Sequence, residues 1–187
     1  TFESKYSYSN NGRRIKTMDI EHFIEAVFKI EFLKIKCINF KKKKKEMEKA
    51  LKSFPEIRSK NFNSNRDRAD IRVPLKNIFA DEFNLIKNIY PPATNLTNAW
   101  SVTYKKGDYH LPHTHGSVGY GGILYLNQHK KHPRTTYLQP WNSPRDNSVL
   151  FNPEVEEGDI MIVPKFIVHQ TEPNKLSMSK RIIGFDF

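Results

Sequence analysis

Residues 100–126 read WSVTYKKGDYHLPHTHGSVGYGGILYL, and this stretch decides the fold of the 187-residue chain. Apolar side chains alternate at Trp100, Val102 and Tyr104, and a second apolar run, GILYL, follows at residues 122–126. Alternation indicates a strand with one buried face, and glycine-containing segments mark the joints between strands. The stretch therefore predicts short strands connected by a polar, histidine-rich loop.

Two further apolar runs, DIMIV at residues 159–163 and RIIGFDF at 181–187, continue this pattern to the end of the sequence. Short strands at irregular intervals, with glycine and proline between them, favour an antiparallel sandwich or barrel. The residues alone therefore predict an α+β chain that is mainly β. We expect a small β barrel or jelly roll with N-terminal helices packed on one side of it.

The first 98 residues carry mostly helical spacing. Between Leu33 and Cys37 apolar residues alternate with lysines, which indicates one strand with a solvated face. No internal repeat is visible and the length suits one core, so we expect a single domain over residues 1–187, with a helical N-terminal half (residues 1–98) and a β core (residues 99–187). Helices are predicted from Asp19 to Phe28, from Lys41 to Phe54 and from Ile78 to Ile89, with a loop from Ile57 to Asp70.

The composition limits the partners and the compartment. A formal net charge of +11 attracts polyanions, so a nucleic acid is a candidate partner, although the run Lys41–Lys45 is typical of a solvated helix face. The single cysteine, Cys37, cannot form a disulfide within the chain, which favours a reducing compartment. No run of eighteen apolar residues and no signal-like segment occurs. We expect a cytoplasmic protein with no membrane association.

Three histidines, His110, His113 and His115, fall within the segment HLPHTH. On a strand, His113 and His115 point the same way and His110 has the opposite parity. Imidazole nitrogens suit iron, zinc, copper or nickel, but a firmly held ion needs at least one more ligand. The pair alone is therefore weak evidence for a metal, because two exposed histidines on a turn are common.

The segment from Glu156 to Phe187 supplies candidates for the missing groups. A barrel can bring His169, which follows a late strand, opposite the histidine pair of an early strand and so complete a metal site with one open side. Arg181, deeper in the barrel, would then meet the distal carboxylate of a small diacid bound to the same ion, since a guanidinium matches a carboxylate. Taken singly, His169 could be a loop histidine and Arg181 a surface charge.

With these residues, the second half resembles the double-stranded β-helix, a jelly-roll or cupin-like barrel, of the Fe(II)/2-oxoglutarate-dependent oxygenases. The likeness is greatest to a small phage and bacterial group that is similar to prolyl hydroxylases. The match covers nearly the whole barrel, whereas the first half shows only the general layout of the family. The matching segments are Trp100, YKKGDYHLPHTHGS (104–117), GGILYLN (121–127), EEGDIMIVPKFIVHQTEPN (156–174) and RIIGFDF (181–187).

The resemblance implies that His113, His115 and His169 are the iron ligands. Most relatives have Asp or Glu at the second ligand position, whereas the phage-like group is similar to this chain in often having histidine. A third neutral imidazole leaves the site one unit more positive and alters metal preference. Three histidines are also a catalytic zinc set, so the identity of the metal stays open.

The resemblance also implies a 2-oxoglutarate site. Arg181 would pair with the far carboxylate of 2-oxoglutarate, Tyr125 would support that carboxylate, and Tyr104 would lie near the metal-bound end. Ile183 departs from the family pattern, because many relatives place a serine hydroxyl two residues after the arginine. The oxygenase hypothesis depends on two features, namely three imidazoles that hold one ion and a guanidinium deeper in the same cavity.

The activity implied by the resemblance is hydroxylation of a C–H bond with Fe(II), 2-oxoglutarate and O2, releasing succinate and CO2. The loops at residues 57–70 and 127–147 are basic or polar with aromatic residues, so an acidic peptide or a nucleic acid would suit as the primary substrate. Two alternatives remain. One is a metal-binding barrel with other chemistry, such as a zinc hydrolase or a cupin-like dioxygenase, and the other is a non-catalytic basic nucleic-acid-binding module.

Overall fold

A computed structural model describes residues 13–17, 20–24, 30–65, 70–90, 93, 95–140 and 150–187. The chain divides into two compact units, residues 1–31 and 32–187, a division that the sequence did not indicate. In the first unit, β1 (Arg13–Thr17) and β2 (Ile20–Ile24) form an antiparallel pair. The helix expected from Asp19 is therefore wrong at residues 20–24, where β-branched and aromatic residues favour a strand. Asp19 and residues 25–28 lie outside the described residues.

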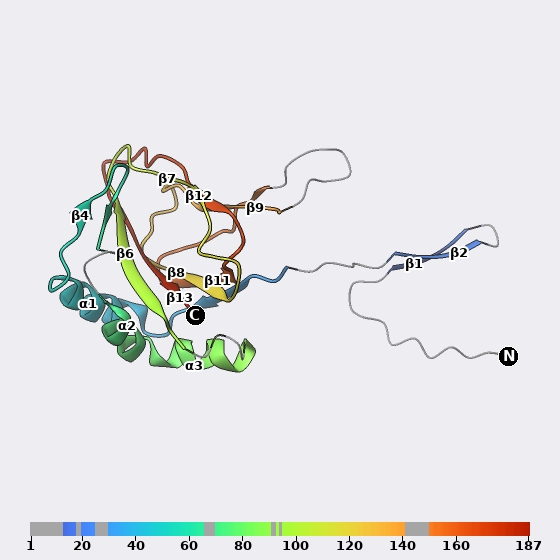
Figure 1. The fold of residues 1–187 in the computed structure, drawn as a ribbon, viewed down its shortest axis with the longest axis horizontal. Helices are drawn as coiled ribbons and strands as arrows, with labels where there is room; N and C mark the ends of the chain where they lie inside the picture. The colour runs from blue at the N-terminus through green and yellow to red at the C-terminus, as the bar shows by residue number, and fades with distance from the viewer. Residues whose placement is uncertain are drawn as a thin grey trace. The chain divides into compact units, whose positions relative to one another are not determined.

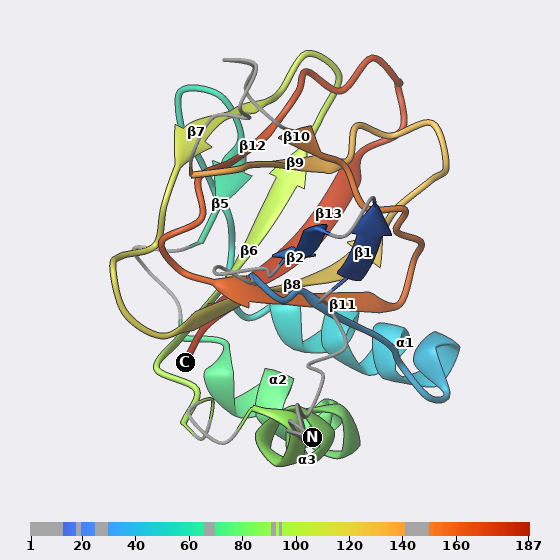
Figure 2. The same cartoon turned by 90° about the vertical axis from the view of Figure 1, so that its right-hand side faces the viewer.

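The second unit contains a large and a small antiparallel sheet, as expected for a jelly roll (Figures 1 and 2). The large sheet has the strand order β3-β11-β8-β13-β6-β5-β4, and the small sheet has the order β10-β9-β12-β7. The strands of the large sheet are β3 (Leu33–Lys36), β4 (Ile57–Arg58), β5 (Asn63–Ser64), β6 (Asn98–Tyr104), β8 (Tyr120–Asn127), β11 (Asp159–Pro164) and β13 (Lys180–Asp186). The strands of the small sheet are β7 (His110–His113), β9 (Thr135–Leu138), β10 (Leu150–Phe151) and β12 (His169–Thr171).

Three helices cover one face of the large sheet, and the small sheet lies on the opposite side (Figure 2). They are α1 (Phe40–Leu51), α2 (Arg72–Ile78) and α3 (Ala80–Ile89). The helix expected at 78–89 begins at Ala80, because a turn at Phe79 separates it from α2. The sequence did not predict α2, which contains Pro74. The expected loop at 57–70 contains β4 and β5, which extend the sheet through pairing with β6. No helix in the described part of the chain is long and apolar enough to cross a membrane.

The two faces of the large sheet have separate apolar cores. Side chains at alternate positions point to the helices, and the remaining positions point to the space between the sheets. The outer core contains Leu124, Ile162, Ile183 and Phe185 with buried residues of the helices, including Met47, Leu75 and Phe83. The inner core contains Trp100, Val102, Tyr104, Ile123, Tyr125, Met161 and Ile182. On β13, even-numbered residues therefore face the space between the sheets and odd-numbered residues face the helices.

The lysine run at residues 41–45 begins α1 and forms the mixed-charge face that the sequence predicted. Lys43 pairs with the buried Glu82 of α3 at 2.7 Å, and Lys44 pairs with Glu157. Lys42 is exposed and lies 4.0 Å from Glu46 one turn later. Much of the positive charge of this run is therefore balanced within the fold.

Replacing Gly122 with alanine is expected to destabilise the protein by about 1–3 kcal/mol, since extra volume in a packed core forces neighbours to move. An added Cβ would lie 2.1 Å from the Phe185 ring and 2.9 Å from Ile162 Cδ1. Thermal unfolding measures the effect. Gly121→Ala is the matched control, because a Cβ there meets its nearest atom at 3.4 Å. Equal melting temperatures for the two variants would contradict the packing of β8 on β13.

Candidate metal centre

Three histidines from separate segments converge between the two sheets, as the sequence predicted. His113 ends β7, His115 follows two residues later, and His169 begins β12. β7 and β12 pair antiparallel with His169 directly opposite His113, so the sheet register brings these two rings together. One nitrogen from each of the three histidines lies within 4.8 Å of the other two. This geometry could hold a single metal ion.

All three rings are oriented by a hydrogen bond at Nδ1. His113 Nδ1 donates to the carbonyl of Leu111 at 2.8 Å, and His169 Nδ1 donates to the carbonyl of Ile167 at 3.1 Å. His115 Nδ1 contacts Asp186 Oδ1 at 2.9 Å. Carbonyl and carboxylate oxygens only accept, so each Nδ1 carries the proton and each Nε2 carries the lone pair that a metal ion needs.

His169 is kept neutral by its surroundings. Burial, followed by the neighbouring His113, lowers the pKa of His169 to about 3. A neutral imidazole is the form that binds a metal ion, so the buried ring needs no deprotonation at physiological pH.

The cavity that contains the triad lies between β6, β8 and β13 of the large sheet and β7, β9 and β12 of the small sheet. Tyr104 lines this cavity, and its ring centroid lies 5.3 Å from Nζ of the fully buried Lys180. Tyr125 is also buried, with its ring 5.7 Å from the same Nζ, and its hydroxyl donates to Thr135, another cavity residue. The structure thus brings both predicted tyrosines together with a lysine.

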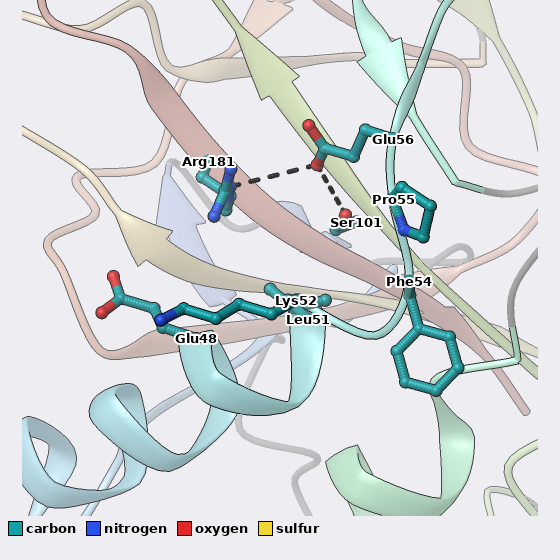
Figure 3. A pocket seen from close by; sticks show the side chains of 8 residues that line it. All are labelled: Glu48, Leu51, Lys52, Phe54, Pro55, Glu56, Ser101 and Arg181. Carbon is teal, nitrogen blue, oxygen red and sulfur yellow. Dashed lines mark hydrogen bonds and ion pairs between the residues drawn. The ribbon is translucent and has the colours of Figure 1, made fainter.

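Arg181 lies outside this cavity, so the second feature on which the oxygenase hypothesis depended, a guanidinium deeper in the same cavity, is wrong. Its side chain points to the outer face of the sheet, where Nε donates to Thr103 Oγ1 at 2.8 Å and lies 3.9 Å from Glu56 Oε1 (Figure 3). A separate pocket surrounds it, next to the end of α1. The reason is the alternation of β13, which places odd-numbered side chains on the helix-covered face.

Lys180 was missed because Arg181 was chosen for its guanidinium, without regard to the face of the strand that each residue occupies. Lys180 pairs with Tyr104 across the sheet, so its parity is that of the inner core. The available signal was the strand period, counted back from an inward-facing residue of β13. The sequence alone does not show which residues of β13 face inward, because Ile182 and Ile183 are identical and pack in different cores.

Two buried polar groups behind the lining of the cavity could be satisfied by a carboxylate. Lys180 Nζ donates to the carbonyl of Pro133 at 2.8 Å, and no carboxylate pairs with it among the residues that the structure describes. Within the same described ranges, the buried hydroxyl of Tyr137 has no hydrogen bond of normal geometry and interacts only with the hydroxyl of Tyr125. A buried ammonium without an anion is costly, so these groups fit an anionic ligand.

Comparison with solved structures identifies the fold. A 2OG-Fe(II) oxygenase family oxidoreductase from Burkholderia pseudomallei has a TM-score of 0.64 at 8% identity, covering 83% of this chain and 82% of that one. HygX from Streptomyces hygroscopicus, solved with nickel and 2-oxoglutarate, has a TM-score of 0.61 at 14% identity, covering 83% and 81%. A prolyl-4-hydroxylase from Pseudomonas putida has a TM-score of 0.52 at 10% identity, covering 83% and 91%.

No protein-family model matches the sequence, and no curated protein matches it either. The structural likenesses therefore show a shared fold, the mainly β jelly roll of the 2-oxoglutarate oxygenases. This confirms the expected fold class, including the helices packed on one side of the barrel.

Proposed function

We propose that this chain is an Fe(II)- and 2-oxoglutarate-dependent dioxygenase that hydroxylates a C–H bond of its substrate. One observation carries the proposal: three imidazoles that present Nε2 share a cavity with Tyr104, whose ring lies next to a buried Lys180 that pairs with no carboxylate in the described part of the chain. The fold is the one that solved 2-oxoglutarate oxygenases have. Bound together, iron, 2-oxoglutarate and O2 supply an oxidant for unactivated C–H bonds and yield succinate and CO2.

In this proposal the side chains bind and orient, and none acts as a nucleophile. His113, His115 and His169 hold the metal on one side and leave the other side open to the co-substrates. Lys180 pairs with the far carboxylate of 2-oxoglutarate, in place of the Arg181 that the sequence suggested. Tyr125, whose hydroxyl already contacts Thr135, supports that end of the molecule. The apolar inner core excludes water from the reacting atoms.

The experiment that tests the function is succinate formation. Purified protein, loaded with Fe(II) under anaerobic conditions, is expected to convert 2-oxoglutarate to succinate once O2 is admitted, because uncoupled turnover needs no primary substrate. Omitting Fe(II) or O2 is expected to stop the reaction. A protein that binds a metal but shows no affinity for 2-oxoglutarate or for N-oxalylglycine would contradict the proposal and favour a metal-binding barrel with other chemistry.

The primary substrate is proposed to be anionic, such as an acidic peptide or a nucleic acid. The chain has a net charge of +11 at pH 7, which raises the local concentration of anions near the surface. Exposed apolar side chains also flank the metal-binding positions in the chain, at Leu111, Val118 and Phe166. If a nucleic acid bound equally well after loss of the three histidines, with strong salt dependence, the chain would instead be a non-catalytic binding module.

A further inference from the structure

The three candidate ligands do not have equivalent hydrogen-bond partners. His113 and His169 each donate Nδ1–H to a main-chain carbonyl two residues earlier, so their partners are neutral. His115 Nδ1 donates instead to a carboxylate, that of Asp186, which lies 71 positions later at the end of β13. Their side chains are only 7% and 9% exposed, so water screens this contact very little.

The surroundings of the His115–Asp186 pair hold both side chains in place. The backbone of Asp186 is fixed as a sheet member, pairing with Asn98 of β6 and Gly121 of β8. A Cβ on Gly121 would lie 3.4 Å from His115 Nδ1 and 3.5 Å from Asp186 Oδ1, so the backbone of β8 packs directly beside the pair. The ring of Trp100 packs near the His115 ring, with the two centroids 5.1 Å apart.

Asp186 is otherwise out of place in this strand. It is buried within the apolar segment GFDF, where a carboxylate is costly unless it is paired. Among the described residues, the hydrogen-bond partner of its carboxylate is His115. The carboxylate therefore acts on His115.

We propose that Asp186 is a positioning residue of the metal centre. It holds His115 in the orientation and tautomer that present Nε2 to the ion, and it places one negative charge beside a ligand set that is otherwise neutral. A carboxylate that hydrogen-bonds a ligating histidine raises the basicity of that ligand, and loss of such a partner typically weakens metal binding about 10- to 100-fold. The inference rests on the proposed metal site.

The test measures metal affinity rather than turnover. Co(II) and Mn(II) are titrated into the metal-free full chain by calorimetry, and the visible spectrum of the Co(II) form reports on the ligand set. Asp186→Ala is expected to raise the Co(II) dissociation constant about 10- to 100-fold. Asp186→Asn keeps an acceptor for Nδ1–H but loses the charge, so its dissociation constant is expected to lie between those of wild type and Asp186→Ala.

A double-mutant cycle separates positioning from a general structural effect. In a His115→Asp background, which keeps a ligand for the ion but removes the Nδ1–H through which Asp186 acts, Asp186→Ala is expected to cause no further loss of Co(II) affinity. Asp159→Asn is the matched control. Asp159 is another buried carboxylate of the large sheet, and it accepts from the backbone N–H of Glu156. This variant is expected to change the melting temperature and not the Co(II) affinity.

The outcomes distinguish the two proposals. Wild-type protein that binds neither Co(II) nor Mn(II) would overturn both the metal site and the role of Asp186. Wild-type protein that binds Co(II), together with Asp186→Ala protein of the same affinity and spectrum, would overturn only the positioning role. Equal losses from Asp186→Ala with and without His115 would also overturn it, since the effect would then not pass through that ring.

Discussion

His169→Ala is expected to abolish succinate formation and to lower Fe(II) affinity more than about 100-fold. Loss of a residue that only hydrogen-bonds a metal ligand typically costs up to about 100-fold, and His169 is itself a candidate ligand. His169 sits opposite His113 in the β7–β12 register and is the most buried of the three residues. Without it, two imidazoles from one segment of chain remain, which is too few to hold a divalent ion firmly. Anaerobic Fe(II) titration and a succinate assay measure both effects.

His132→Ala is the matched control for that substitution. His132 is buried, with Nδ1 accepting from the His129 N–H and Nε2 contacting the Met178 carbonyl. These partners make it a structural histidine outside the triad. His132→Ala is expected to lower the melting temperature while Fe(II) affinity stays within about twofold of wild type, because it breaks buried hydrogen bonds only. A large loss of Fe(II) affinity in this variant would show that the metal lies elsewhere.

The sequence predicted the barrel because its strands carry strong local signals. Short apolar runs bounded by glycine and proline mark β6, β8, β11 and β13, and all four form as expected. The short strands β4 and β5 were not predictable, because two-residue strands form only where a partner is already in place. The pair β1–β2 was missed because its apolar spacing also fits a short helix.

The candidate site was predictable in its ligands and not in its supporting residues. HxH and a later histidine form a pattern that the chain order displays directly. Predicting Lys180 and Asp186 instead requires knowing which face of β13 each residue occupies. An error of one residue in the strand assigns a side chain to the other face of the sheet. The expectation for Arg181 made that error, whereas the strand period, counted from a buried neighbour, places Lys180 on the inner face.

Substitutions at two adjacent positions test this correction most directly. Lys180→Met is expected to weaken 2-oxoglutarate binding about 30-fold or more, since truncating one partner of a buried charge pair typically costs about 2–5 kcal/mol. Arg181→Ala is expected to leave the dissociation constant within about twofold of wild type, because its guanidinium contacts Thr103 and Glu56 on the other face. Calorimetric titration of the Mn(II) form with 2-oxoglutarate measures both. The reverse result would return the carboxylate site to Arg181.

The pH dependence of the same binding follows from the charge of Lys180. Burial lowers the pKa of Lys180 to about 7, whereas in the unfolded chain it stays near 10.5. Between these values the folded protein has lost a proton that the unfolded chain keeps, so the stability of the ligand-free protein rises with pH in this window. Lys180→Met is expected to remove that rise and, by removing a buried charge, to increase the melting temperature at pH 7.

Binding of 2-oxoglutarate must have the opposite dependence on pH. The carboxylate pairs with the ammonium form, so above pH 7 binding takes up a proton and its dissociation constant rises, approaching tenfold per pH unit. Lys180→Arg provides the control, because a guanidinium keeps its charge throughout this range and is expected to flatten the profile. A wild-type dissociation constant that stays constant between pH 7 and 9 would show that the ammonium of Lys180 does not hold the diacid.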